Sequence, residues 1–349
     1  MAKIVFLGDV FCEKEGLCPT FSSELYGDCC VLNYEGVYDN GALTDSDAAP
    51  QKTNLKGTGN PFGATFKKYI ATLANNHILD YTQRGCESTL RFLSDNGVQQ
   101  VGLTGPGIKQ RFLSILDGVS IAAYMFDKLK YTQLDGCAYA VEKMDEVRMI
   151  ADARLARAAG SRFHVISLHW GTELLGKPWP NQVATAHRLV DSGAADMILG
   201  MHPHCLQPVE SYKGKYIFYS IGNAVFSDFK QPSKFANGVP ANVFGCSWGQ
   251  ESKMSIVPIL NTEDMSVVPL LACSRGGGRM SSVHKTAPIL KTAPQVTRGD
   301  AYLAVCRRFL SGVRLLLRGD LGTAQFHFKA SIASFKSYSK TLRSICREP

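Results

Sequence analysis

Side chains that can bind a metal ion follow several apolar runs of the sequence, at the point where each run ends. The stretches are Gly8-Asp9, Asn33-Tyr34-Glu35-Gly36, Asn75-Asn76-His77, His169-Trp170-Gly171, Met201-His202-Pro203-His204 and Ile221-Gly222-Asn223. Four of the eight histidines of the chain lie in these stretches. Carboxylates, amides and imidazoles together form an oxygen- and nitrogen-rich ligand set suited to Mn, Fe, Zn or Mg.

A single histidine after an apolar run is more often a buried, hydrogen-bonded side chain or an incidental loop residue than a metal ligand. The set as a whole favours a metal site, because ligand sites in open α/β sheets form outside the carboxyl ends of the strands. His202-Pro203-His204 adds to this, since proline stiffens a turn that could direct two imidazoles at neighbouring ions. The sequence therefore predicts a metal centre at one edge of a sheet.

The elements that would carry these side chains alternate between short apolar runs and helical patterns. We expect strands at Lys3–Leu7, Cys29–Asn33, Tyr69–Leu73, Val119–Tyr124, Phe163–Leu168, Met197–Leu199, Tyr216–Ser220 and Met254–Ile259. We expect helices at Arg84–Asn96, Met144–Ala159 and Pro180–Ser192. This order predicts an α/β protein with a sheet core and helices outside it.

The composition is that of a folded chain without a membrane span. The 349 residues are 45% hydrophobic, which is too apolar for a disordered protein. No uncharged apolar run approaches the roughly 20 residues that a bilayer requires. The first apolar stretch ends at Asp9, too early for a signal peptide. The eleven cysteines include no Cys-x-x-Cys pair, so we expect thiols that pack in the core of a cytoplasmic protein.

The net charge of +8 is concentrated at the C-terminal end. Residues 295–349 hold ten basic and three acidic residues. Apolar residues at helical spacing predict a basic helical tail over 300–349, joined by an irregular linker over 271–299 to a main body over 1–270. Such a tail could contact a polyanion or the inner face of a membrane, or pack on the main body with its charges in water. Nucleic acid is not an expected partner, because no recognised binding motif accompanies the charge.

Taken in order, the motifs resemble those of the CapA-type capsule or poly-gamma-glutamate biosynthesis proteins, a branch of the calcineurin-like metallophosphoesterases. The match rests on the stretches quoted above, on Ile78-Leu79-Asp80-Tyr81 and on Ser192-Gly193-Ala194-Ala195-Asp196. It covers roughly residues 3 to 270. The resemblance implies a metallophosphatase fold of two packed mixed β-sheets flanked by helices (α-β-β-α), with metal ions at one edge.

The resemblance also implies a set of site residues. One or two divalent ions (Mn, Fe, Zn, Mg or Ca) would be held by Asp9, Glu35, Asn76, His169, His202 and His204. Glu35 would bridge the ions, and His77 would be the acid/base, oriented by Asp80. Beyond the resemblance, Lys52, Trp170, Glu173 and Asn223 are candidates for substrate contact, although an aromatic residue such as Trp170 is as often part of the core. Two departures, Phe11 in place of a histidine and Glu35 in place of an aspartate, predict a weak second metal position or a single ion.

The function that follows is a metal-dependent hydrolase in capsule, exopolysaccharide or polyglutamate biosynthesis. A metal-activated water would attack a phosphate ester or amide of a small-molecule, peptide or polymer-precursor substrate, with His77 delivering the proton. Two alternatives use the same residues differently. One is an epimerase or isomerase, in which the cation polarises a carbonyl while His77 moves a proton at the neighbouring carbon. The other is a non-catalytic polymer-assembly subunit.

Overall fold

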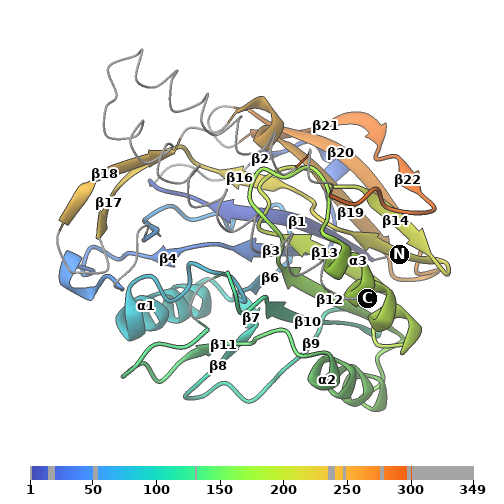
Figure 1. Cartoon of the computed structure of the whole chain (residues 1–349), viewed down its shortest axis with the longest axis horizontal. Coiled ribbons are helices and arrows are strands. Elements are labelled where there is room, and N and C mark those ends of the chain that lie inside the picture. Colours follow the sequence, from blue (N-terminus) through green and yellow to red (C-terminus); the bar gives the residue numbers. More distant parts are fainter. Residues whose placement is uncertain are drawn as a thin grey trace.

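Two mixed β-sheets make up the centre of the fold (Figure 1). The structure is a computed structural model, and it describes residues 2–14, 20–49, 54–129, 132–234, 240–246, 249–275, 279–296 and 300. The larger sheet has the strand order β2 (Thr20–Phe21), β21 (Arg279–Thr286), β20 (Val267–Arg275), β19 (Met254–Asn261), β1 (Lys3–Phe11), β3 (Cys29–Tyr34), β6 (Lys68–Thr72) and β7 (Gln99–Val101), with β16 (Asn223–Phe226) paired to β1. Strands β1, β3, β6 and β7 are parallel, whereas β19 is antiparallel to β1.

The second sheet also combines parallel and antiparallel pairs. Its order is β22 (Ile289–Leu290), β14 (Val209–Tyr212), β15 (Lys215–Phe218), β13 (Met197–Met201), β12 (Phe163–His169), β10 (Val119–Met125) and β9 (Leu113–Ser114). Three small pairs complete the strands: β4 (Val37–Tyr38) with β5 (Lys56–Gly57), β8 (Leu103–Thr104) with β11 (Ala140–Val141), and β17 (Phe229–Lys234) with β18 (Pro240–Cys246).

Alternate side chains of β10 show how the layers are stacked. Ile121 and Ala123 belong to the main hydrophobic core, which both sheets share. Ala122 and Tyr124 point the other way, into a second core that includes residues of α2 (Glu146–Ala158) and α3 (Pro180–Asp191). This period of two is the one expected when a sheet is buried on both faces.

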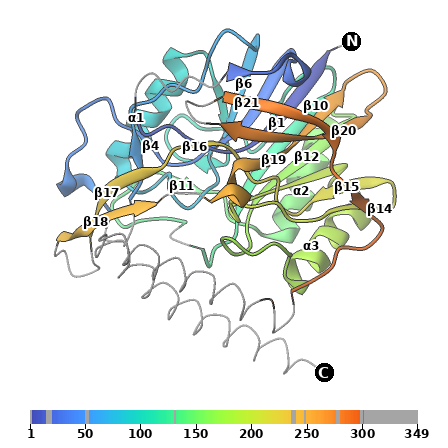
Figure 2. The ribbon, with the colours of Figure 1, turned by 90° about the horizontal axis from the view of Figure 1, so that it is seen from above.

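Helix α1 (Thr82–Asp95) lies away from α2 and α3, beside β4 (Figure 2). Short 3₁₀ turns occur at Ser23–Leu25, Asp45–Asp47 and Gln250–Lys253. The predicted fold class, two packed mixed sheets with helices outside, is confirmed. The predicted strands and helices are found with ends shifted by at most a few residues. In the part of the chain that the structure describes, no helix combines the length and apolar character needed to span a bilayer.

The irregular linker predicted for residues 271–299 is wrong over much of its length. Strands β20 and β21 pair in antiparallel fashion with each other, and β20 pairs with β19, so the larger sheet extends to residue 286. The Ser-, Arg- and Gly-rich sequence there is typical of a loop. Strand pairing through the backbone does not depend on that composition, and burial of Ala272 and Met280 gives it an apolar side. The basic tail predicted over 300–349 lies outside the described residues except for Asp300, and it stays a prediction.

A buried histidine at the start of β12 makes the fold sensitive to acid. The His164 side chain has no solvent exposure, and its Nδ1 lies 2.7 Å from Ser120 Oγ. Its Nε2 has no hydrogen-bond partner among the described residues. Burial, with the nearby Arg157 charge, lowers the pKa of His164 to about 4, against an ordinary value of 6.5. The unfolded chain therefore binds a proton at a higher pH than the folded chain does.

We predict that this difference costs stability as the pH falls below 6.5. Between pH 7 and pH 5 only the unfolded state gains the His164 proton, which lowers the free energy of unfolding by about 2 kcal/mol. Urea denaturation of the metal-free full chain at both pH values measures this change. In His164→Gln the change should be smaller by that amount, whatever the variant's stability at pH 7. An identical change in both proteins would contradict the assignment.

Candidate metal centre

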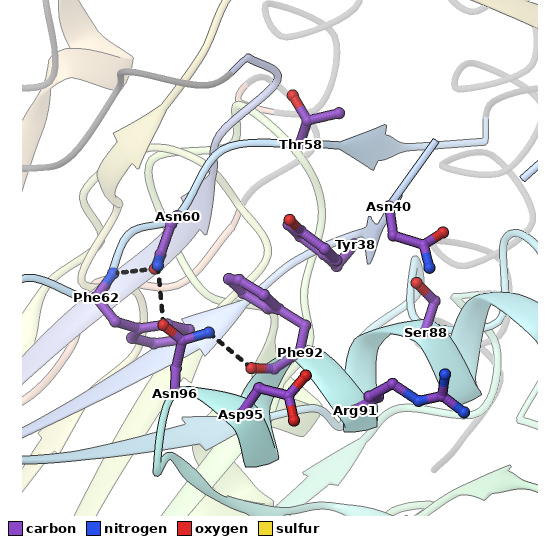
Figure 3. Close-up of a pocket in the computed structure, with 10 residues that line it drawn as sticks. All are labelled: Tyr38, Asn40, Thr58, Asn60, Phe62, Ser88, Arg91, Phe92, Asp95 and Asn96. Carbon is purple, nitrogen blue, oxygen red and sulfur yellow. Dashed lines mark hydrogen bonds between the residues drawn. The ribbon is translucent and has the colours of Figure 1, made fainter. Parts of the chain in front are cut away.

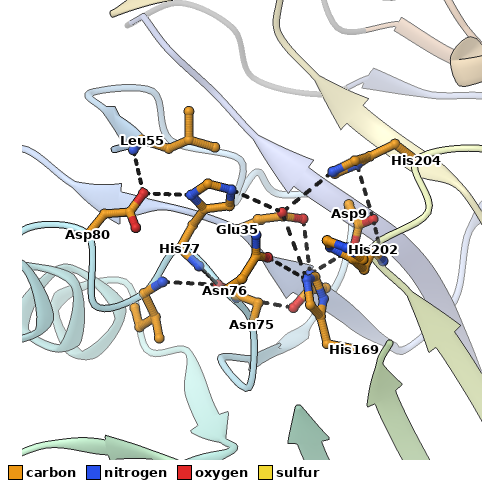
Figure 4. A network of polar contacts seen from close by, with 12 residues as sticks. Asp9, Glu35, Leu55, Asn75, Asn76, His77, Asp80, His169, His202 and His204 are labelled. Atoms are coloured by element: carbon orange, nitrogen blue, oxygen red, sulfur yellow. Dashed lines mark hydrogen bonds and ion pairs between the residues drawn. The ribbon is translucent and has the colours of Figure 1, made fainter. Parts of the chain in front are cut away.

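The strand ends of the two sheets meet at one edge, and the polar side chains predicted there converge (Figure 4). Asp9 comes from β1, Glu35 follows β3, and His77 lies in the loop after β6. From the second sheet, His169 ends β12, and His202 and His204 follow β13. Each of these side chains is at most 8% exposed. The cluster is therefore a buried polar group inside an otherwise apolar core.

Two sets of three side chains have ligand atoms close enough to share an ion. One set is Glu35, His202 and His204, and the other is Asp9, Glu35 and His169. Within each set the ligand atoms lie within 4.8 Å of one another. Glu35 is common to both sets, and its Oε1 is 3.7 Å from His204 Nε2 and 4.0 Å from His169 Nε2. A single carboxylate thus stands between two possible metal positions.

Asp9 is held in place by its neighbours in the sheet. Asn33 donates from Nδ2 to Asp9 Oδ1 over 2.8 Å, and the His202 backbone N–H donates to Asp9 Oδ2 over 3.1 Å. The strand register places Asp9 beside both Asn33 and Asn223, with a bulge on each side. A bulge at this point re-aims a side chain without breaking the sheet.

Gly8 makes this register possible, because β1 and residue Gly222 approach very closely. The Asp9 backbone N–H donates to Gly222 O over 3.2 Å. A Cβ at Gly8 would lie 1.7 Å from that same oxygen. No side chain fits there without moving the backbone that carries Asp9.

The His202-Pro203-His204 turn has an unusual backbone. His202 and His204 both have positive φ, 92° and 53°, which is uncommon for residues other than glycine. Such conformations occur at functional sites where the surrounding structure enforces them. His204 Nδ1 is fixed by Asn223 Oδ1 at 2.8 Å, so its Nε2 faces Glu35. The turn thus directs both imidazoles into the cluster.

His77 forms a pair with Asp80 at the rim of the cluster. His77 Nδ1 lies 2.6 Å from Asp80 Oδ2, and the same oxygen accepts a hydrogen bond from the Leu55 backbone N–H at 2.6 Å. The opposite ring nitrogen, Nε2, lies 3.9 Å from Glu35 Oε1. A carboxylate bound to Nδ1 fixes the ring orientation and leaves Nε2 directed at the centre.

The electrostatics of the cluster suit a cation. Burial raises the pKa of Asp9, although His204 and the hydrogen bonds from Asn33 and His202 oppose this. Burial lowers the pKa of His169 well below its ordinary value, and the neighbouring imidazoles lower it further. His169 is thereby kept in the neutral form in which an imidazole binds metal. Two buried carboxylates without a cation would carry a large desolvation cost. The donor set therefore fits one or two divalent ions.

The six predicted ligand residues are brought together by the structure. The sixth, Asn76, is half-buried and lies at the edge, where its Oδ1 is 2.7 Å from His169 Nε2. The four candidates for substrate contact lie in different places. Trp170 is 2% exposed and donates to Tyr219 O in the core beneath α3, so it is a packing residue. Asn223 contacts His204, Glu173 lies in the loop after β12, and Lys52 lies outside the described residues.

Two asparagines with clear roles were not among the predicted site residues. Asn33 donates to Asp9 and is itself held by Asn75, whose Nδ2 is 3.3 Å from Asn33 Oδ1. Asn75 also donates to Tyr34 O at 2.8 Å and accepts from the His77 backbone N–H at 3.0 Å. Both asparagines lie in the polar stretches that follow apolar runs of the sequence, but nothing in those stretches shows that their amides bond other protein groups instead of a metal.

Sequence comparison relates the chain to capsule synthesis proteins. A family model described as "Bacterial capsule synthesis protein PGA_cap" matches residues 17–228. The chain is 32% identical to the capsule biosynthesis protein CapA of Bacillus anthracis and 33% identical to the PGA biosynthesis protein CapA of Bacillus subtilis, each over 45% of this chain. These alignments span only 40% and 42% of the two relatives. A Mycobacterium tuberculosis protein, "Probable polyglutamine synthesis accessory protein", is 27% identical over 57% of this chain and 55% of its own.

Solved structures similar to this one are distant. They include the calcineurin-like phosphoesterase YfkN of Bacillus subtilis, with a TM-score of 0.30 and 16% identity over 69% of this chain and 70% of that one. The NAD nucleotidase of Haemophilus influenzae has a TM-score of 0.31 and 13% identity over 79% and 51%. Such values carry no inference about activity.

We predict that metal content depends on the clustered residues. Elemental analysis of the full chain, purified without chelator, should find one or two divalent transition ions, and both Glu35→Gln and His204→Ala should lose most of them. Asn33→Ala should weaken metal affinity roughly 10- to 100-fold, as expected when a residue orienting a ligand is removed. His187→Ala is the matched control, because His187 bonds Glu210 on the far side of the second sheet. Unchanged metal content in Glu35→Gln and His204→Ala would contradict the assignment.

We also predict that Gly8→Ala disrupts the centre through the backbone. The new Cβ would clash with Gly222 O, so the free energy of unfolding should fall by about 3 kcal/mol or more, with loss of bound metal. Gly176→Ala is the control, since its Cβ would meet nothing nearer than 4.0 Å, and it should stay within about 0.5 kcal/mol. Urea denaturation of both variants measures the effect. A Gly8→Ala protein as stable as the parent would show that the close approach is not required.

Proposed function

The chain belongs to the bacterial capsule synthesis protein family, and from this premise we propose that it is a metal-dependent hydrolase. Its substrate would be a phosphate ester or an amide of a capsule, exopolysaccharide or polyglutamate precursor. The names of the relatives support the polymer class. The single observation that carries the proposal is the His77–Asp80 pair, which directs one imidazole nitrogen at the carboxylate shared by two possible metal positions.

Six residues would hold the metal: Asp9, Glu35, Asn76, His169, His202 and His204. Glu35 is the candidate bridging ligand, because it belongs to both sets of close donor atoms. Divalent ions bound there would supply Lewis acidity and a water of lowered pKa. The chain itself supplies the orientation of these ligands, through Asn33 on Asp9 and Asn223 on His204.

His77 would act as the general acid that protonates the leaving group. Asp80 accepts from Nδ1–H and stabilises the imidazolium, so Nε2 can carry the proton to be delivered. The Leu55 backbone N–H holds Asp80 in place. His77 is 8% exposed, the largest exposed fraction among the clustered carboxylates and imidazoles, so a substrate arriving from the surface would meet this ring first.

The first departure from the phosphoesterase pattern supports an asymmetric centre. Phe11 is 3% exposed, and its ring packs against Phe226 at 5.4 Å and Phe229 at 5.7 Å. Phe226 in turn contacts the His204 ring at 4.9 Å. An apolar wall thus stands where a further imidazole would be needed, which favours one strong and one weaker metal position.

The test is hydrolysis by the full chain with added Mn²⁺. The substrates are p-nitrophenyl phosphate for ester cleavage and γ-glutamyl-p-nitroanilide for amide cleavage. We expect His77→Ala to lower kcat about 10²- to 10⁴-fold, the range for loss of a general acid, while its metal content stays at the parent level. Asp80→Asn should lower kcat in the same direction. His187→Ala should leave it unchanged.

Three results would overturn the proposal. Equal hydrolysis by His77→Ala and the parent would remove His77 from the reaction. Deuterium incorporation from heavy water without hydrolysis of either substrate would favour the isomerase. Retained polymer synthesis in cells carrying His77→Ala and His204→Ala together would favour the non-catalytic subunit.

A further inference from the structure

A pocket lined mainly by polar residues lies between α1 and the segment that follows Glu35, and it shares no residue with the metal centre (Figure 3). Its volume is about 610 Å³, within the range of pockets that bind small molecules. It begins at Tyr38 of β4, three residues after Glu35. The site therefore adjoins the chain segment that carries the shared carboxylate.

One wall of the pocket is already fixed by its own hydrogen bonds. Asn60 donates from Nδ2 to Asn96 Oδ1 at 2.9 Å, and Asn96 donates from Nδ2 to Phe92 O at 2.8 Å. Asn60 Oδ1 accepts from the Phe62 backbone N–H at 2.8 Å. These amides hold the pocket in shape and have largely used their hydrogen-bonding capacity.

The aromatic side chains that line the pocket stack on each other. Tyr38 and Phe92 stack with ring centroids 3.8 Å apart and planes 6° from parallel. Phe92 is 7% exposed, so its face is covered by Tyr38 and is not open for a sugar ring to stack on. This arrangement argues against a saccharide as the occupant.

Three further polar residues of the pocket come from one face of α1. Ser88, Arg91 and Asp95 are spaced by three and four residues, so they lie in one row along the helix. Neither Arg91 nor Asp95 forms an ion pair with any residue that the structure describes. Ser88 Oγ is buried and likewise has no hydrogen-bond partner there. A cation and an anion thus line the pocket, exposed and without an ion-pair partner among the described residues.

We infer that this pocket binds an α-amino acid head group, with its carboxylate on Arg91 and its ammonium on Asp95. A guanidinium pairs with a carboxylate through two parallel hydrogen bonds. A ligand with one charge would satisfy only one side chain of the row. The head group has both charges on one carbon.

The inference rests on the proposed function for the identity of the larger ligand. A polyglutamate linked through its side-chain carboxyls keeps a free ammonium and a free carboxylate on its first residue. The pocket would therefore hold the amino end of such a polymer or of its precursor.

Isothermal titration calorimetry of the full chain as purified tests this with γ-glutamylglutamate as the probe. We expect saturable binding, and affinity at least about tenfold weaker in Arg91→Gln and in Asp95→Asn, the effect of losing one charge-assisted hydrogen-bonded pair. Acetylation of the dipeptide's amino group should weaken binding to the parent by a similar factor, and should add little in Asp95→Asn. Arg154→Gln and Asp127→Asn, at exposed positions elsewhere, are the controls and should bind as the parent does.

Absence of binding, or equal affinity in the parent and in both pocket variants, would overturn the inference. So would binding of N-acetylglucosamine that survives Arg91→Gln and Asp95→Asn, because it would identify a saccharide site. Since the titration measures binding and not turnover, and Arg91 and Asp95 lie outside the metal centre, its result is independent of the hydrolysis assays. Binding without hydrolysis would refute the proposed function alone, and hydrolysis without binding would refute the pocket assignment alone.

Discussion

The structure depends on the burial of two carboxylates, Asp9 and Glu35, where the strand ends of two sheets meet. Both are at most 1% exposed and face histidine rings rather than water. An ion in such a place is strongly destabilised unless an opposite charge accompanies it. A divalent cation would supply that charge, and the closely packed backbone at Gly8 and the positive φ of His202 and His204 lie around the place where it would bind. The strained backbone at these residues and the candidate metal site thus occur at the same place in the fold.

The residues that face the centre could be predicted from the sequence because of a rule of strand geometry. Parallel strands end at the same edge of a sheet, so Asp9 and Glu35 lie together in the larger sheet, and His169 and His202 lie together in the second. Asn33 and Asn75 were not predicted as site residues, because they act through hydrogen bonds to other protein groups, and the spacing of residues does not show such bonds. Trp170 stands directly beside a candidate ligand in sequence, yet alternation along the strand turns its ring to the opposite face.

The outer strands were harder to predict than the inner ones for a related reason. The inner strands are buried on both faces, so they appear as continuous apolar runs. Strands β20 and β21 lie toward one side of the sheet and contain Ser, Arg and Lys, which makes them look like a loop. The pocket beside α1 has no recognisable pattern in the sequence. Its walls come from segments that are polar and unremarkable in sequence and become a site only when loop 58–62 is tied to the end of the helix.

The position of β1 in the larger sheet has a consequence for biosynthesis. This first strand lies between β3 and β19, and it also pairs with β16, so three of its neighbours are distributed over the first 261 residues. On the ribosome, the edge of β1 that β16 and β19 will cover stays open until most of the chain has been made. The loop bearing His202 and His204 is likewise translated well after β1. The centre therefore cannot be completed before residue 204 has been made, and a chain terminated earlier would expose an apolar strand edge and lack two of the six proposed metal ligands.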